Sequence, residues 1–285
     1  MNTASQFNLA TACPGLQLGE DGIYYAAASE AISYPDEGNA ACFEVEDQSF
    51  WFRHRNDCIL ELVRNFPPRG NGPIFDVGGG NGFVAKGLMN AGWDVVLVEP
   101  GPSGARNAKK RGLEHVICGT THSAGFQNGS LPAIGVFDVV EHIEDDLGFL
   151  RHLWDLLEPG GILYLTVPAY KFLWSHEDVD AGHFRRYTLR NLQKKITDSG
   201  FEVSFATHLF FFLPLVVFLF RTMPFRLKLV KTANISATIH KDHSMPSGPG
   251  GAALNALLAW EVGKFKNGGR MLSGGSCAVV ARKPL

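Results

Sequence analysis

Short apolar runs and amphipathic segments alternate along the middle of the chain. The apolar runs are rich in Val, Ile and Leu, which is typical of buried strands, and the segments between them have helical periodicity. Because strands that alternate with helices form parallel sheets covered on both faces, the pattern predicts an α/β fold. The expected strands are 73–78, 94–99, 114–118, 133–138 and 160–167, and the helices between them are 82–91, 102–111 and 145–158.

Segments on both sides of this alternation add further elements. A helix over 189–199 and strands over 201–207 and 276–282 follow it. Upstream, residues 43–66 have the spacing of one long amphipathic helix, for which packing against the sheet edge and a role as a lid both stay open. Residues 23–32 suit a short helix.

One run, from His208 to Phe220, is apolar almost throughout. It is shorter than the roughly 20 residues that a membrane-spanning helix needs. Two interpretations of 209–222 stay open: a core or cap helix, or a peripheral contact with a membrane surface. The second is helped by the basic residues just beyond, which are Arg221, Arg226, Lys228 and Lys231.

Charge is unevenly distributed over the 285 residues. The chain carries a net charge of −2 and is 45% hydrophobic, which allows one large α/β domain with insertions and argues against a nucleic-acid partner. From Phe211 onward ten Lys and Arg stand against two Asp and Glu. This local excess suits an anionic membrane surface, an acidic substrate or a solvated face.

The five cysteines are scattered and include no Cys-x-x-Cys pair, so neither a disulfide framework nor a zinc site is indicated. No basic residue and no long apolar run precedes Arg53, so a secretory signal is not expected. These features favour a cytoplasmic location, with peripheral membrane contact as the alternative.

The most informative local pattern is Asp-Val-Gly-Gly-Gly-Asn-Gly, from Asp76 to Gly82, where the first expected strand ends. Glycines can adopt positive φ and allow a ligand to approach the backbone closely. The free N–H groups at the start of the next helix favour an anionic or electron-rich ligand group. The spacing is Gly-x-Gly-x-Gly after an acid, which differs from the Gly-x-Gly-x-x-Gly of dinucleotide-binding folds.

A second acid, Glu99, ends the neighbouring strand 21 residues beyond Gly78. At the tip of that strand its carboxylate can accept hydrogen bonds from both hydroxyls of a ribose. Nicotinamide enzymes share such an acid, so Glu99 indicates a ligand that contains a nucleoside but does not indicate methyl transfer.

The glycine pattern resembles motif I of class I S-adenosylmethionine (SAM) dependent methyltransferases. Residues 126–143, with Asp-Val-Val-Glu-His-Ile at their end, look like the segment around the fourth strand of that family. Residues 157–168 resemble its fifth strand, and 50–55 its Trp-Trp-Phe-x-x-Arg segment. The resemblance implies SAM as cofactor and a Rossmann-like, seven-stranded, mostly parallel sheet. Its antiparallel last strand would lie between strands five and six.

On this interpretation the chain has four parts. They are an N-terminal arm with lid helices (1–70), a SAM-binding core (71–208), a cap insertion (209–274) and the last core strand (275–285).

The resemblance also assigns cofactor contacts. An arginine of the lid helix reaches the SAM carboxylate in the family, and both Arg53 and Arg55 are candidates. The acid that usually contacts adenine is missing, and Ser123 or His122 stands in its place. The expected cofactor-binding residues are Asp76, Gly78, Gly79, Gly80, Gly82, Glu99, Pro100, Thr121, His122, Phe137, Asp138, Arg53 and Arg55.

Methyl transfer from a sulfonium requires in-line alignment and, for some acceptors, a base. Glu141, His142 and His183 are the candidate catalytic residues, because all three follow the fourth or fifth strand and can face one cleft. The connection 170–187 is polar and aromatic, which favours a functional role. The candidate substrate contacts are Trp51, Tyr170, Trp174, Arg186 and Tyr187.

Part of this set resembles a metal-binding variant of the family. Ubiquinone-pathway O-methyltransferases and small-RNA terminal 2′-O-methyltransferases share a Glu-x-x-Glu-His segment and a later histidine. Asp138, Glu141, His142 and His183 take these places here, and they could hold Mg²⁺, Mn²⁺ or Zn²⁺ to acidify a hydroxyl acceptor. Two alternatives stay open: Glu141 and His142 cap the next helix, or a histidine acts as a metal-free base.

Together these features predict a SAM-dependent methyltransferase with a small-molecule acceptor, favouring oxygen over nitrogen or carbon. A saccharide, a lipid-linked intermediate and an aromatic metabolite all stay open as acceptors, and so does the oligomeric state. The alternatives are a non-catalytic SAM-binding or scaffold protein and a metal-dependent 2′-O- or catechol-type O-methyltransferase. A nicotinamide oxidoreductase is disfavoured by the glycine spacing.

Overall fold

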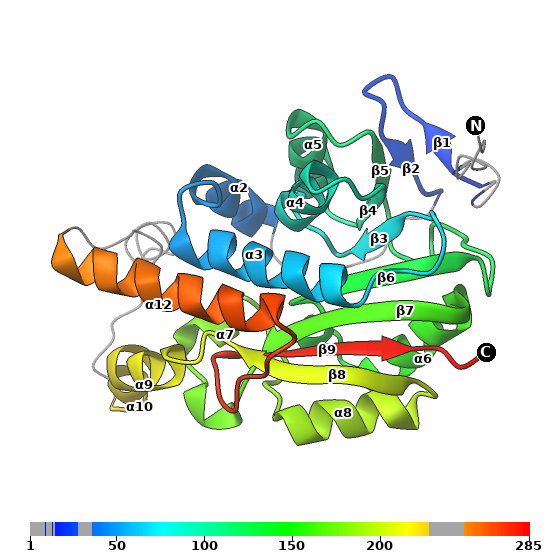
Figure 1. Cartoon of the computed structure of the whole chain (residues 1–285). Helices are drawn as coiled ribbons and strands as arrows, with labels where there is room; N and C mark the ends of the chain where they lie inside the picture. The colour runs from blue at the N-terminus through cyan, green and yellow to red at the C-terminus, as the bar shows by residue number, and fades with distance from the viewer. Residues whose placement is uncertain (1–8, 10–12, 14, 28–35, 228–247) are drawn as a thin grey trace.

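The computed structural model describes Leu9, Cys13 and residues 15–27, 36–227 and 248–285. One sheet runs through them, in the strand order β1-β2-β5-β4-β3-β6-β7-β9-β8 (Figure 1). Its five central strands are parallel, which confirms the predicted α/β class. They are β3 (Ile74–Val77), β4 (Val95–Glu99), β5 (His115–Cys118), β6 (Leu131–Phe137) and β7 (Leu157–Pro168).

At one edge of the sheet the chain order is broken. Strand β9 (Ser276–Arg282) lies between β7 and β8 (Glu202–Leu209) and is antiparallel to both. The prediction of an antiparallel last strand between strands five and six is therefore confirmed.

The opposite edge carries two strands that the sequence did not predict. Strand β2 (Tyr24–Tyr25) pairs in parallel with β5, and β1 (Gln17–Leu18) pairs with β2, so the sheet has nine strands and not seven. The expected helix over 23–32 is wrong for its described part, 23–27, and the remainder lies outside the described residues. Pairing with the open edge of β5 prevails here over the local pattern.

Helices cover both faces of the sheet. One apolar cluster joins α6 (Asp146–Leu156) and α8 (Leu189–Asp198) to the first face, and a second joins α3, α4, α5 and α12 to the other. Phe75 belongs to the first cluster and Ile74 to the second, because successive side chains of a strand point to opposite faces. The bounds of the second group are α3 (Phe50–Asn65), α4 (Phe83–Asn90), α5 (Pro102–Lys110) and α12 (Pro249–Lys266).

The long helix expected over 43–66 is two helices, so that expectation is wrong. Helix α2 (Asp36–Val45) ends before α3 begins, and Ser49 caps α3 by accepting hydrogen bonds from the backbone N–H groups of Trp51 and Phe52 at 3.2 and 3.3 Å. A serine that caps a helix in this way favours a new start over continuation.

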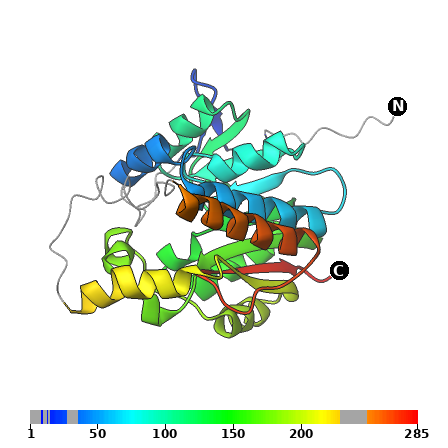
Figure 2. The same ribbon diagram turned by 60° about the vertical axis from the view of Figure 1, so that its left-hand side comes forward.

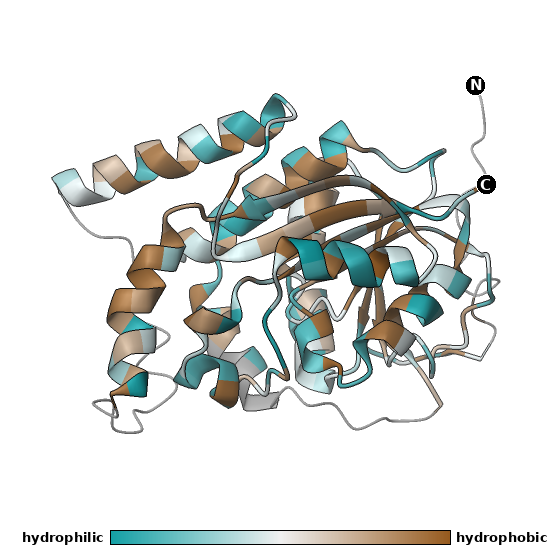
Figure 3. Ribbon diagram, turned by 90° about the horizontal axis from the view of Figure 1, so that it is seen from below, coloured by the Kyte–Doolittle hydropathy of each residue, from teal (hydrophilic) through white to brown (hydrophobic). Residues whose placement is uncertain are grey.

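The insertion between β8 and β9 begins with a helical segment at the edge of the molecule. It comprises α9 (Leu213–Val217), a π-helical turn η3 (Phe218–Thr222) and α10 (Met223–Arg226). Figure 3 shows the segment as largely apolar, and its Leu215 and Phe220 are 66% and 74% exposed. Leu209 and Phe210, by contrast, are buried in the core.

No helix in the described part of the chain is both long and apolar enough to cross a membrane. Lys228 and Lys231, two of the basic residues that favoured membrane contact, lie outside the described residues. The last helix of the insertion, α12, lies alongside α3 in both views (Figures 1 and 2).

Candidate functional site

A cavity of about 1590 Å³ opens where β3, β4, β6 and β7 reach their carboxyl ends. Pockets for one small ligand usually measure about 300–1,000 Å³. This cavity therefore has room for a cofactor and an acceptor together. Parallel α/β sheets bind their ligands at this end.

The glycine turn after β3 forms the floor of one half of the cavity. Gly78 and Gly80 have φ of 70° and 54°, and a Cβ on Gly78 would lie 2.7 Å from Cγ2 of Val139. Glu99, at the end of β4, accepts hydrogen bonds from the N–H of Gly80 at 2.8 Å and of Gly101 at 2.7 Å. The carboxylate of Glu99 thus fixes the glycine turn and itself lines the cavity.

Asp76 lies buried beneath this turn and lines the cavity. Burial raises the pKa of its carboxyl group to about 7, although the nearby Arg55 guanidinium opposes the shift. Its Oδ2 atom has no hydrogen-bond partner among the described residues. A buried carboxylate that is only partly satisfied fits a ligand that brings its own donor or positive charge, as the amino group of SAM does.

Of the two arginine candidates, the structure brings only Arg55 to the cavity. Its guanidinium lies 4.7 Å from the centre of the Trp51 ring, and its Nη1 donates to Oδ2 of Asp138. Arg53 is exposed and lies outside the lining. The Nε of Arg55 has no hydrogen-bond partner among the described residues, so this side chain retains a donor for a ligand.

The side of the cavity next to β5 is formed by Thr121 and His122, with Pro100 beside them. The ring of His122 stacks on that of His152 at 3.7 Å between centroids. His152 Nε2 lies 3.1 Å from the hydroxyl of Thr121. His152, on α6, was not singled out from the sequence because no local pattern links it to the loop after β5.

Helix α2 closes another side of the cavity through hydrogen bonds to the core. Asn81 Nδ2 donates to the carbonyl of Asn39 at 2.8 Å and to Glu46 at 3.1 Å. Arg111 pairs with the other carboxylate oxygen of Glu46 at 2.7 Å. These buried contacts hold α2 over the glycine turn, where the N-terminal lid was expected.

Three ionisable groups meet at the other end of the cavity. Glu141, His142 and His183 each offer a ligand atom within 4.8 Å of the others. Burial, then the charge of Asp138, raises the pKa of Glu141 well above its ordinary value. Burial and the neighbouring His183 lower the pKa of His142 to about 4, so its imidazole is neutral at pH 7.

Asp138, the fourth expected metal ligand, is not part of this group. It sits after β6 with a φ of 59° and is held by Arg55 and by the hydroxyl of Thr166, 3.1 Å away. The donor set is therefore one carboxylate and two imidazoles. Oε2 of Glu141 has no hydrogen-bond partner among the described residues, and such a set suits a divalent cation.

Asp178, which the sequence did not single out, organises this end of the cavity. It is fully buried in α7 (His176–Asp180) and accepts hydrogen bonds from His183 Nδ1 at 2.8 Å and Arg186 Nε at 2.7 Å. Burial alone would raise the pKa of Asp178, but these hydrogen bonds hold it below its ordinary value. Because Nδ1 of His183 donates to this carboxylate, Nε2 is the nitrogen left for another partner.

The expected substrate contacts divide into two groups. Trp51 and Arg186 line the cavity, whereas Tyr170, Trp174 and Tyr187 do not. Tyr187 is buried, and its hydroxyl donates to Asp146 at 2.8 Å, while that of Tyr170 lies 3.2 Å from His208 Nε2. Among the glycines, Gly82 also lies outside the lining.

An apolar wall faces the Glu141–His142–His183 end. It is contributed by the helical segment of the insertion, and its members are Leu213, Val216, Val217 and Phe220. The cavity thus has a polar floor at the glycine turn and a mixed polar and apolar lining at the Glu141–His142–His183 end.

The strand order, the glycine turn and the acid at the end of β4 together define the class I, SAM-dependent methyltransferase fold. A family model described as a methyltransferase domain matches residues 51–204, which is more than half of the chain. The chain belongs to this methyltransferase domain family, and the predicted resemblance is confirmed.

Curated relatives match a shorter stretch. The ubiquinone biosynthesis O-methyltransferase of Xanthomonas campestris pv. campestris is 28% identical over 99 residues, which cover 33% of this chain and 41% of the relative. The enzyme of the same name from Xanthomonas axonopodis pv. citri is 27% identical over 117 residues, which cover 39% of this chain and 49% of the relative. The chain thus spans less than half the length of these relatives.

Solved structures share the fold. Phosphoethanolamine N-methyltransferase 2 of Haemonchus contortus, solved with SAM, superposes with a TM-score of 0.55 at 16% identity over 89% of this chain and 58% of that one. A SAM-dependent methyltransferase of Thermotoga maritima superposes with a TM-score of 0.53 at 18% identity, over 87% of this chain and 100% of that one.

Proposed function

We propose that the protein transfers the methyl group of SAM to a hydroxyl oxygen of a small-molecule acceptor. The observation that carries the proposal is the position of the Glu141–His142–His183 cluster. It shares one cavity with the glycine turn, so a base lies within reach of the place where a methyl donor would bind.

On the cofactor side, the proposed contacts are those of the residues that line the floor. Asp76 and Arg55 would take the charged groups of the methionine part, Glu99 the ribose, and Thr121 and His122 the adenine. When bound, SAM supplies an already activated methyl group. The protein therefore needs only to align the acceptor and to remove its proton.

On the acceptor side, His183 is the proposed base. Asp178 fixes the orientation of the His183 ring through its contact with Nδ1, as a third group orients the base in nucleophile–base pairs. A proton from the acceptor hydroxyl would move to Nε2 of His183. Glu141 and neutral His142 would lie on either side of that hydroxyl, and Arg186 would hold Asp178 in place.

A second form of the same proposal uses a divalent cation. Glu141, His142 and His183 would hold it, and it would lower the pKa of an acceptor hydroxyl. The partly unsatisfied carboxylate of buried Glu141 supports this form, because a cation would stabilise its charged state.

The acceptor is proposed to have an apolar part. Leu213, Val216, Val217 and Phe220 line the side of the cavity away from the glycine turn. Lipid-linked and aromatic metabolites fit this wall better than a bare saccharide does. The relatives named for ubiquinone biosynthesis support an oxygen acceptor of this kind.

Two experiments test the proposal. Isothermal titration with SAM and with NADH should give heat only with SAM, since an NADH isotherm would favour the oxidoreductase alternative. Incubation of the full chain with radiolabelled SAM and a metabolite extract, with and without EDTA, should label an extracted molecule. SAM binding without any labelled product would favour a non-catalytic SAM-binding protein, and loss of label with EDTA would favour the metal-dependent form.

A further inference from the structure

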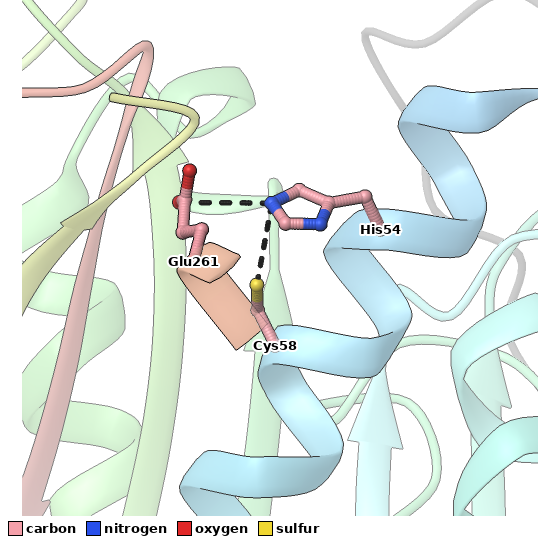
Figure 4. A group of neighbouring side chains, drawn as sticks. All are labelled: His54, Cys58 and Glu261. Carbon is pink, nitrogen blue, oxygen red and sulfur yellow. Dashed lines mark hydrogen bonds and ion pairs between the residues drawn. The ribbon is translucent and has the colours of Figure 1, made fainter. Parts of the chain in front are cut away.

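A second cluster of potential ligands lies away from the cavity, between α3 and α12. His54 and Cys58, one turn apart on α3, point toward Glu261 of α12 (Figure 4). The side chains are buried, with 3%, 0% and 0% of their surfaces exposed. None of the three lines the cavity.

The two separations that join His54 to the other donor atoms match the edges of a small tetrahedron. His54 Nε2 lies 3.5 Å from Cys58 Sγ and 3.6 Å from Glu261 Oε1, and all three donor atoms are within 4.8 Å of one another. Zinc bonds of about 2.0–2.3 Å at tetrahedral angles separate neighbouring ligand atoms by about 3.3–3.7 Å. The side chains would need little movement to surround such an ion.

The charge of Glu261 gives a second, independent argument. Within the described part of the chain no Lys or Arg forms an ion pair with this fully buried residue, and the imidazole of His54 is its ion-pair contact, at 3.6 Å from Oε1. Its two oxygens accept hydrogen bonds from the N–H groups of Phe210 at 2.5 Å and Phe211 at 3.2 Å. A carboxylate has about four lone-pair sites, so these bonds leave room for a cation, which a buried carboxylate strongly favours.

We propose that His54, Cys58 and Glu261 bind a thiophilic divalent cation, of which zinc fits best. A thiolate and an imidazole select zinc over magnesium or calcium, whose ligands are oxygens. The three residues offer three donor atoms, one sulfur, one nitrogen and one oxygen, and a water would complete the four of a tetrahedral zinc site. The ion binds the thiolate of Cys58 and displaces its proton to solvent.

The proposed ion has a structural role. It joins α12, which belongs to the insertion, to α3, which carries Trp51 and Arg55 into the cavity wall. The ring of Phe210, whose N–H binds Glu261, stacks on Trp51 at 5.5 Å with an interplanar angle of 4°. The site would therefore hold the insertion in one position relative to α3 and its cavity-lining side chains.

Cobalt(II) provides a specific test, because a sulfur-to-cobalt charge-transfer band in the near ultraviolet requires a thiolate ligand. The Glu141–His142–His183 cluster has no sulfur and cannot produce this band. The full chain, stripped with a chelator, is titrated with CoCl₂ and then with ZnCl₂. We expect the band to grow to one equivalent per chain and to disappear when zinc displaces cobalt.

Substitutions identify the residue that produces the charge-transfer band. Cys58→Ala should abolish it, whereas Cys277→Ala, a matched change at another fully buried cysteine, and His142→Ala should retain it. Glu261→Gln should lower cobalt affinity by more than the roughly 10–100-fold typical of second-shell changes. No band in the wild-type protein, or a band that survives Cys58→Ala, would overturn the proposal and leave a hydrogen-bonded triad only.

Discussion

Two clusters built from similar side chains lie in opposite surroundings. Glu141, His142 and His183 line a large cavity, whereas His54, Cys58 and Glu261 are enclosed between two helices. The first can meet a ligand that enters from solvent, and the second can reach only what is enclosed with it. The same donor chemistry thus suits turnover in one place and architecture in the other.

The two clusters also differ in what supports them. Behind His183 stands Asp178, whose buried carboxylate sets the orientation of the ring. Behind Glu261 stand two backbone N–H groups, which fix the carboxylate without adding charge. The proposed base is thus held by an ionised side chain, and the proposed structural ligand is held by the main chain.

The largest expected effect tests the open cluster. His183→Ala should lower turnover by about 10²–10⁴-fold, because general-base catalysis typically contributes that much. SAM affinity, measured by titration, should stay unchanged, and His115→Ala at an exposed histidine is the control. A fully active His183→Ala protein would remove His183 from the proposed mechanism.

Metal removal tests the enclosed cluster. An ion present at 100 times its dissociation constant stabilises a folded protein by about 2.7 kcal/mol. Chelation should therefore lower the melting temperature of the wild-type and Cys277→Ala proteins, and it should not affect Cys58→Ala. Equal sensitivity of Cys58→Ala to the chelator would place the stabilising ion elsewhere.

Substitutions on the floor of the cavity should have a smaller effect than those in either cluster, and they should act on SAM affinity. Asp76→Ala or Glu99→Ala should weaken SAM binding by about 1–3 kcal/mol through lost charge-assisted hydrogen bonds. Titration calorimetry measures the change, and Asp94→Ala, at a residue outside the cavity lining, is the control. Unchanged affinity in both variants would contradict the cofactor assignment.

Titration of Asp76 should make both protein stability and SAM affinity change gradually with pH. Burial raises the pKa of its carboxyl from 3.8 to about 7, so the folded chain holds a proton there that the unfolded chain loses earlier. Stability of the ligand-free protein should therefore fall as pH rises between these values. SAM affinity should rise toward pH 8, because a cationic ligand group favours the ionised form, and Asp76→Asn should flatten both profiles.

The smallest expected effect on stability concerns the exposed apolar helix. Leu215→Ser and Leu219→Ser should change stability by no more than about 0.5 kcal/mol, since both side chains are already exposed and lie outside the cavity lining. If the segment contacts membranes, these variants should sediment less with anionic liposomes than the wild type does. Leu18→Ser, at an exposed leucine on the other edge of the sheet, is the control, and equal sedimentation of all the variants would exclude that contact.

The sequence predicted the parts of the fold that depend on local pattern. Apolar strands, the glycine turn and Glu99 are all visible in short windows, and the sheet forms where they indicated. The added strand β2 was missed because its stability comes from pairing with β5, far along the chain. The break at Ser49 was missed because one cap outweighs a continuous apolar stripe.

The candidate site was harder to predict for the same reason. The choice between Arg53 and Arg55 depends on which side of α3 faces Asp138, more than 80 residues away. Asp178 has no motif of its own and is recognised only by what it orients. The absence of a Cys-x-x-Cys pair argued against zinc, yet Cys58 meets a carboxylate that lies some 200 residues further along the chain.

The place of β9 has a consequence for biosynthesis. Among the strands that the structure describes, β8 pairs with β9 alone, and β9 leaves the ribosome after the whole insertion has been made. Until then β7 and β8 each have an unpaired edge, and such edges invite association with other chains. During translation, chaperone capture of nascent chains that end within the insertion would follow from this order of pairing.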